Sequence, residues 1–306
     1  MISQKTISRL ASVLCVVVLS PFANAQQYAP QAYPSTLPAP PVPPQPGAMI
    51  RGQIPSVVSK RVIIVDDRTG SVLYEKNSLE KCAVASTQKL LTALCVLDAG
   101  PLSDMVQIQS SDTQVEPTKV YVKSGEKYNR AELLKALIVK SGNDVAKALA
   151  RDVAGSEDRF IAMMNAKARK IGMLHSNFKN PHGLTEEGQY STARDLAILA
   201  RAATRNSLLA DYMKVKGYYF VHSNGKKRWL ENTNKLLKSV SYCTGMKTGT
   251  TNASGRCLVS SGELNGRKVI VVCLGSDSSN VFADSTKLLN WALVPAAAPP
   301  KAIPVE

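Results

Sequence analysis

The sequence predicts a mixed fold of the α/β (α+β) class, with an antiparallel sheet flanked by helices and a helical lobe inserted into it. Two short β-type runs, 61–66 and 72–76, open the folded part of the chain, and two longer ones, 255–263 and 267–275, close it. Helical periodicity dominates the residues between these runs. This order of strands, helices and strands predicts one sheet that is completed by both ends of the folded part.

The opening hairpin and the first long helix follow from local signals. Residues 67–70, Asp-Arg-Thr-Gly, join the first two β-runs as a turn. A helix is expected to begin near Ser86, because apolar side chains then recur at helical spacing, at Leu90, Leu94 and Leu97.

The later elements are predicted in the same way. Asn129 and Glu132 form a capping-box-like helix start, followed by an apolar face made of Leu133, Leu134, Leu137 and Ile138. Asn265-Gly266 is a two-residue hairpin signal between the last two strands. Further helices are expected over 144–153, 156–171, 192–204 and 280–294.

The N-terminal 25 residues have the pattern of a signal peptide. Lys5 and Arg9 precede a short apolar run, and Ala23-Asn24-Ala25 forms a cleavage site, so the mature chain is expected to begin at Gln26. We therefore predict an exported protein, periplasmic or extracellular, that is soluble after processing. Residues 26–56 form a Pro-rich spacer, 57–294 the folded body and 295–306 a short disordered tail.

The net charge is +15 and would be +13 without the signal peptide, which contributes two positive and no negative charges. Export argues against nucleic acid as the partner of this basic chain. Electrostatic contact with anionic envelope polymers is one expectation, and a solvated basic face that aids solubility is the other.

The cysteines and histidines do not form a metal-binding pattern, and we expect neither a metal nor a cofactor. The five cysteines of the mature chain include no C-x-x-C pair, and the three histidines are scattered. Cys257 and Cys273 lie on the two strands of the last hairpin with an offset of one residue. They are therefore expected to face opposite sides of the sheet, without a disulfide.

Three short motifs contain residues capable of chemistry. Ser86-Thr87-Gln88-Lys89 places a hydroxyl and an amine on one helix face, where a lysine of lowered pKa can act as base toward the serine. Such a motif alone is weak, because S-x-x-K also occurs on solvated helix faces.

The second motif is Ser141-Gly142-Asn143, expected in a turn between two helices. Its hydroxyl can relay a proton and its amide can hold a substrate carbonyl. The third, Lys247-Thr248-Gly249, is followed by Thr250 and is expected on a β-edge. There lysine and threonine can bind a carboxylate, and glycine leaves room for a substrate backbone.

In this order the three motifs correspond to S-x-x-K, S-x-N and K-T-G, and the chain resembles the low-molecular-mass penicillin-binding proteins, the serine D-Ala-D-Ala carboxypeptidases and endopeptidases. The middle motif differs from the common Ser-Asp-Asn. The resemblance runs from about Ile63 to Trp291 and rests on residues 85–92, 141–144, 180–184, 190–193, 232–234 and 245–249.

The resemblance implies a serine D,D-peptidase/β-lactamase-like fold over 57–294 and a set of roles for the site residues. The resemblance implies that Ser86 is the nucleophile and that Lys89 is its base. It also implies that Ser141 and Lys247 pass a proton to the leaving D-Ala. By the same resemblance, Asn143 would hold the peptide, and Lys247 with Thr248 would bind its terminal carboxylate. The backbone N–H groups of Ser86 and Thr250 would stabilise the oxyanion. Peptidoglycan stem peptides are the implied substrates, with β-lactams as covalent inhibitors of a monomeric enzyme.

Three alternatives to a carboxypeptidase remain open. A D,D-endopeptidase is suggested by the stretches around Asn232 and Asn252. A β-lactamase would need a second base, for which Glu231 is the nearest candidate, although its surroundings do not match E-x-x-L-N. A wall-binding protein without catalysis would not need intact motifs. His182 is predicted to be structural and Arg256 to be solvated.

Overall fold

The protein was analysed as a computed structural model, which describes residues 52–277 and 280–295. The predicted signal peptide, the spacer up to residue 51 and the tail from residue 296 lie outside the described residues. Among the described residues, no helix combines the length and apolar character that a membrane span requires.

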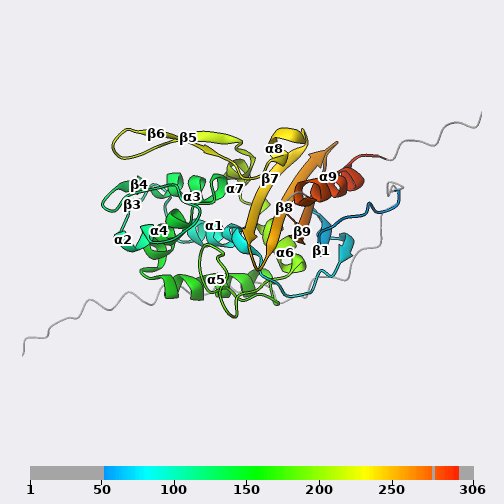
Figure 1. Ribbon diagram of the computed structural model, residues 1–306, viewed down its shortest axis with the longest axis horizontal. Coiled ribbons are helices and arrows are strands. Elements are labelled where there is room, and N and C mark those ends of the chain that lie inside the picture. The colour runs from blue at the N-terminus through cyan, green and yellow to red at the C-terminus, as the bar shows by residue number, and fades with distance from the viewer. Residues whose placement is uncertain (1–51, 278–279, 296–306) are drawn as a thin grey trace, which may run out of the picture. The chain divides into compact units, whose positions relative to one another are not determined.

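A five-stranded antiparallel sheet joins the two ends of the folded part, as predicted (Figure 1). Strand β1 pairs with β2 on one side and with β9 on the other, where Ile63 lies opposite Val272. Strand β7, which carries the third motif, forms the far edge. The strands in spatial order are β2 (Val72–Lys76), β1 (Arg61–Asp66), β9 (Arg267–Ser276), β8 (Gly255–Leu264) and β7 (Cys243–Thr251).

The two faces of the sheet belong to different apolar clusters. Helix α9 (Asn280–Leu293) packs on one face and is tied to the start of the folded part, since Asp284 accepts hydrogen bonds from the backbone and hydroxyl of Ser59. The helical lobe covers the other face. Cys273 belongs to the first cluster and Cys257 to the second, so the prediction that they face opposite sides is confirmed.

The helical lobe matches the predicted elements closely, and the structure has three additional short helices that were not predicted. Asn129 caps α3 by accepting a hydrogen bond from the Ala131 N–H at 3.0 Å. The predicted helices correspond to α1 (Lys89–Asp98, preceded by the 3₁₀ turn η1, Ala85–Gln88), α3 (Arg130–Val139), α4 (Asn143–Ala154), α5 (Glu157–Ile171) and α6 (Ala193–Thr204). The additional ones are α2 (Ser110–Thr113), α7 (Ser207–Lys214) and α8 (Leu236–Ser239).

Two small two-stranded sheets were not predicted. Strands β3 (Met105–Gln107) and β4 (Lys127–Asn129) pair within the lobe. Strands β5 (Gly217–Val221) and β6 (Lys227–Glu231) form a ribbon that leads directly into residues 232–234, beside the catalytic motifs.

Candidate active site

Ser86 and Lys89 lie where the helical lobe meets the sheet. Ser86 is in the 3₁₀ turn and Lys89 begins α1, so their side chains share one face. The Lys89 ammonium lies 2.9 Å from the Ser86 hydroxyl oxygen. The pair therefore has the contact that proton transfer from hydroxyl to amine requires.

Lys89 is completely buried, and three oxygens surround its ammonium. It donates to Asn143 Oδ1 at 2.7 Å and to the His182 carbonyl at 2.6 Å, besides Ser86. Burial lowers the pKa of Lys89 well below its usual value, and the positive charge of Lys247 lowers it further, against the opposing effect of Asp144. A lysine in this environment can hold a neutral amine, the form that accepts a proton.

The second motif forms the turn that joins α3 to α4, as expected. Ser141 has a positive φ of 67°, which only a minority of non-glycine residues adopt, and its hydroxyl lines the same pocket as Ser86. Asn143 is the first residue of α4, and its backbone N–H donates to the Thr118 carbonyl at 2.7 Å. Its side-chain amide donates to the Glu116 carbonyl and accepts from Lys89, so Asn143 orients the lysine.

Asp144, the residue after the second motif, fixes the wall opposite the sheet. It is fully buried and accepts hydrogen bonds from the backbone N–H groups of Val120 and Tyr121 at 3.0 and 2.7 Å. These bonds hold the segment that contains Thr118, which also lines the pocket.

Lys247 contributes the second buried ammonium. It is 1% exposed, and its only hydrogen bond among the described residues is to the Thr248 carbonyl, at 3.2 Å. Burial lowers the pKa of Lys247 to about 7. Its charge also disfavours protonation of Lys89, so the two amines are electrostatically coupled.

The rest of the third motif sets the distance between strand β7 and the turn that carries Ser86. A Cβ added at Gly249 would lie 2.8 Å from the Ser86 backbone nitrogen and 2.9 Å from the Val84 carbonyl oxygen. Glycine therefore allows the strand and the Ser86 turn to approach closely, in addition to lining the pocket. Arg256, which is exposed as predicted, donates to the Thr250 hydroxyl at 3.1 Å.

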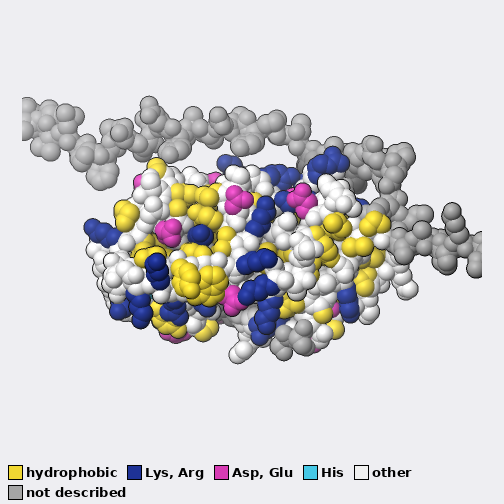
Figure 2. All heavy atoms as spheres, turned by 90° about the horizontal axis from the view of Figure 1, so that it is seen from above, with side chains coloured by type: hydrophobic (Ala, Val, Ile, Leu, Met, Phe, Trp, Pro, Cys, Tyr) yellow, Lys and Arg dark blue, Asp and Glu magenta, His cyan; other side chains and the backbone are white. Residues whose placement is uncertain are grey.

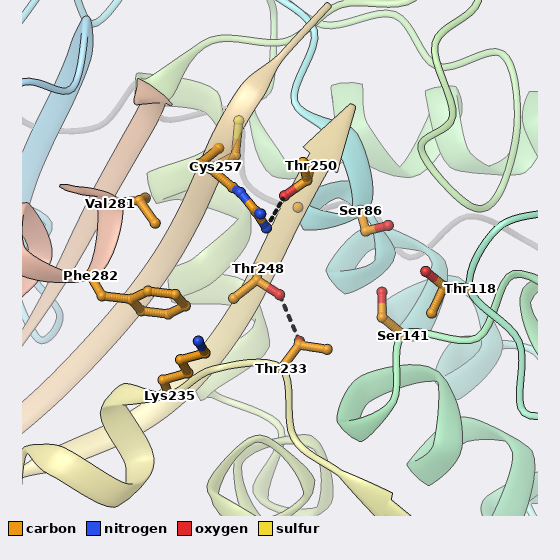
Figure 3. A pocket seen from close by; sticks show the side chains of 12 residues that line it. Ser86, Thr118, Ser141, Thr233, Lys235, Thr248, Thr250, Cys257, Val281 and Phe282 are labelled. Atoms are coloured by element: carbon orange, nitrogen blue, oxygen red, sulfur yellow. Dashed lines mark hydrogen bonds between the residues drawn. The ribbon is translucent and has the colours of Figure 1, made fainter. Parts of the chain in front are cut away.

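A pocket of about 550 Å³ connects all three motifs. Figure 3 shows the hydroxyls of Ser86, Ser141 and Thr118 gathered at one end, with Lys235 and Phe282 at the other. Between them, the Thr248 hydroxyl donates to the Thr233 hydroxyl at 2.6 Å. The structure thus brings every predicted site residue to one place. Lys89, Asn143 and Lys247 are buried behind the residues that line the pocket.

Residues 180–184 contribute backbone groups that side-chain motifs do not reveal. The His182 carbonyl accepts hydrogen bonds from both Lys89 and Ser86. Asn180 Oδ1 accepts from the Gly183 N–H and thereby shapes this loop. Gly183 has a φ of +91°, and a Cβ there would lie 2.2 Å from the Ala85 carbonyl oxygen, so only glycine fits. The His182 ring is buried, which lowers its pKa to about 3.

Among residues 52–277 and 280–295, no group of histidine, cysteine and carboxylate side chains could hold a metal ion, and the five cysteines described are all free. The arrangement offers a hydroxyl, two buried amines and backbone donors. These are the components of covalent catalysis by a serine.

The sequence matches a family model described as D-alanyl-D-alanine carboxypeptidase over residues 49–278. It is 35% identical over 240 residues to the D-alanyl-D-alanine carboxypeptidase DacF of Bacillus subtilis, covering 76% of this chain and 62% of the relative. This chain therefore spans less than two thirds of that carboxypeptidase. It is also 33% identical to a D-alanyl-D-alanine endopeptidase of Pseudomonas aeruginosa, covering 84% of this chain and 85% of that protein.

Solved structures show the same architecture. The DD-transpeptidase of Streptomyces K15 aligns with a TM-score of 0.75 at 29% identity, over 78% of this chain and 98% of that one. A penicillin-binding protein homologue from Mycobacterium tuberculosis aligns with a TM-score of 0.76 at 31% identity, over 83% of this chain and 98% of that one.

Proposed function

Because the chain belongs to the D-alanyl-D-alanine carboxypeptidase family of serine peptidases, we propose that it removes the terminal D-alanine from peptidoglycan stem peptides through an acyl-enzyme on Ser86. The observation that carries the proposal is the 2.9 Å contact between the Ser86 hydroxyl and the Lys89 ammonium. Burial lowers the pKa of Lys89, which favours the neutral amine that such a contact requires. β-Lactams would acylate the same hydroxyl and inhibit the enzyme.

In the acylation step, the neutral amine of Lys89 takes the proton of Ser86 as its oxygen attacks the carbonyl between the two D-alanines. The negative charge on that carbonyl oxygen is stabilised by the N–H groups of Ser86 and Thr250. The C–N bond then breaks, and the leaving amine receives a proton by way of Ser141 and Lys247. Water hydrolyses the resulting ester and regenerates the Ser86 hydroxyl.

Substrate orientation would come from the β7 side of the pocket. Lys247 and Thr248 would bind the terminal carboxylate. This carboxylate would give the buried Lys247 ammonium a charged partner, because its only hydrogen bond among the described residues is to the Thr248 carbonyl. Asn143, which already contacts Lys89, would also contact the peptide. The substrate would lie along Gly249 and Thr250, which both line the pocket.

A second candidate activity is hydrolysis of cross-links by a D,D-endopeptidase. It is favoured by the match to relatives named endopeptidases in Pseudomonas aeruginosa and Escherichia coli, both at 33% identity. Both activities use the same acyl-enzyme and differ in the amine that leaves.

The β-lactamase and non-catalytic alternatives have less support. The described residues that line the Ser86 pocket include no aspartate or glutamate to serve as a second base. Glu231, the candidate named from the sequence, instead forms an ion pair with Lys238. A wall-binding role alone would not explain why two lysines are buried around the Ser86 site.

The same proposal includes four further properties of the protein. These are export, a monomeric state, contact with anionic envelope polymers and a catalytic domain over residues 57–294.

The decisive experiment is acylation by a fluorescent penicillin, followed by gel and mass spectrometry over hours for the wild type and Ser86→Ala. A lasting adduct on Ser86 that the variant lacks is expected. Rapid loss of the adduct would instead indicate a β-lactamase. A folded wild type that takes no label would refute the serine mechanism. Uncross-linked pentapeptide and cross-linked dimer, offered in parallel, separate carboxypeptidase from endopeptidase.

A further inference from the structure

A second cavity of about 330 Å³ adjoins the catalytic pocket, and Thr233 and Lys235 line both. It lies between the end of α3, the segment that precedes β5 and the start of α8. We call it the lysine cavity. Its charged lining residues are Lys140, Lys216, Lys235, Lys238 and Glu231.

Positive charge is in excess in the lining of the lysine cavity, where four lysines face one glutamate. Glu231, its single carboxylate, already forms an ion pair with Lys238. No described carboxylate lies within ion-pair distance of the Lys140, Lys216 or Lys235 ammonium. Figure 2 shows Lys and Arg side chains gathered on the face that carries α8 and the β5–β6 ribbon. Like charges brought together around a hollow favour an anionic occupant.

The turn at residues 232–234 gives the lysine cavity a fixed frame. Asn232 and Asn234 are 7% and 1% exposed. The Asn232 side chain donates to the Val215 carbonyl at 2.9 Å and accepts from the Asn234 N–H at 2.8 Å. The Thr233 N–H donates to the Val139 carbonyl at 3.3 Å, next to Lys140. The lysines therefore project from positions that buried hydrogen bonds hold in place.

The lysine cavity also lies at a defined end of the catalytic pocket. The Thr248 and Thr233 hydroxyls are 2.6 Å apart, and Figure 3 places Lys235 beyond them, away from Ser86. If the carboxylate of the leaving residue binds Thr248, atoms that extend from that residue pass Thr233 toward the lysines. A leaving D-alanine carries only a methyl group in that direction, which has no charge to offer the lysines. A leaving amine that belongs to a second peptide brings further carboxylates.

We propose that the lysine cavity is a leaving-group subsite that binds a carboxylate carried by the departing D-residue or by the peptide attached to it. The inference rests on the proposed acyl-enzyme function and specifies its substrate class. Leaving groups with an anionic extension would be preferred to neutral ones of the same length.

The test uses peptides with one acyl part and two leaving residues of equal length, D-2-aminopimelate and its side-chain amide. For the wild type, kcat/KM is expected to be about fivefold higher for the free acid, and the preference should weaken with added salt. In Lys140→Gln/Lys235→Gln, and to a smaller extent in Lys235→Gln alone, the ratio should fall toward one. Lys227→Gln, a control on exposed strand β6 that lines neither cavity, should keep the wild-type ratio.

The outcomes separate the two proposals. A wild-type ratio of one, or a ratio that the double variant leaves unchanged, overturns the lysine subsite while hydrolysis itself stands. A preference equally reduced in Lys227→Gln would assign it to overall charge and also overturns the subsite. Failure of the wild type to release either leaving residue, with no penicillin adduct on Ser86, would refute the proposed function instead.

Discussion

The side-chain carbonyl of Asn143 lies 2.7 Å from the Lys89 ammonium, so the first residue of α4 holds the amine at the start of α1. The second motif therefore contributes to the site in two ways: Ser141 lines the pocket, and Asn143 is buried behind it. The protonation state of Lys89 should depend on which acceptor stands at position 143.

Asn143→Asp should raise the pKa of Lys89, because a carboxylate would replace the neutral carbonyl beside the ammonium. The acidic limb of the kcat/KM profile should then move to higher pH, with activity near neutrality reduced at least tenfold. Asn143→Ala is the control, since it removes the acceptor without adding charge and should not move that limb upward. Identical acidic limbs in wild type and Asn143→Asp would contradict the assignment of Lys89 as base.

The wild-type pH profile of kcat/KM should be bell-shaped. Lys89 must lose its proton to act as base, so activity rises with pH through its lowered pKa. Lys247 must keep its proton to bind the carboxylate, so activity falls as pH rises beyond about 7 in the free enzyme. Bound substrate should raise the pKa of Lys247 and move the alkaline limb of kcat to higher pH.

Lys247→Arg should abolish that alkaline limb, because arginine stays protonated over the whole range. A steady-state pH series on a pentapeptide measures both proteins. An alkaline limb that is unchanged in Lys247→Arg would mean that another group causes it.

Lys247→Met should stabilise the fold while it lowers activity. Lys247 is buried and makes one hydrogen bond to the part of the chain that the structure describes, and its pKa is about 7 in the folded state against an ordinary value of 10.5. Between these values the unfolded chain binds more protons, so wild-type stability rises with pH. The advantage of the variant should be about 1–3 kcal/mol near pH 7 and shrink toward pH 10.

Denaturant unfolding of both proteins at several pH values measures this difference. Lys89→Met is the matched comparison and should not stabilise, because it removes the Lys89 donor to the Asn143 side-chain oxygen and one of the two donors to the His182 carbonyl. A Lys247→Met protein that is less stable than the wild type at pH 7 would count against a destabilising ammonium.

Gly249→Ala should slow acylation by penicillin roughly tenfold or more, because the new Cβ would press on the backbone of the Ser86 turn. Gly262→Ala on the neighbouring strand β8 is the control. There the nearest atoms are side-chain methyls of Leu293 and Leu289, which can shift. It should cost stability but leave the acylation rate close to that of the wild type. Equal acylation rates in the two variants would show that the close approach at Gly249 is not critical.

The sequence was sufficient to predict the sheet, the long helices and the residues that meet at the site. Short β-type runs indicated β1 and β2, a capping-box-like start indicated α3, and helical patterns indicated α4 to α6. The β5–β6 ribbon was missed although Asn224-Gly225, which follows an aromatic run, is a hairpin signal. Strands β3 and β4 are too short for a periodic signal, and residues 108–126 separate them.

The groups around Lys89 were predictable only in part. Ser86 and Asn143 belong to motifs, but the third acceptor is the carbonyl of His182, and a backbone carbonyl has no residue type to recognise. The burial that lowers the pKa of both lysines also depends on tertiary packing. Only the assembled lobe and sheet create it.

The pairing of β1 with β9 has a consequence for how the enzyme becomes active during biosynthesis. Strand β1 can pair with β2 early, but it can pair with β9 only after nearly all of the folded part has been synthesised. The helices of the lobe pack on one another and precede the late strands in the chain, but Lys247 and Gly249 join Ser86 only once those strands dock. A partly folded chain would therefore hold Ser86, the proposed nucleophile, without the rest of the site. The peptidase would remain latent until its last strands are in place.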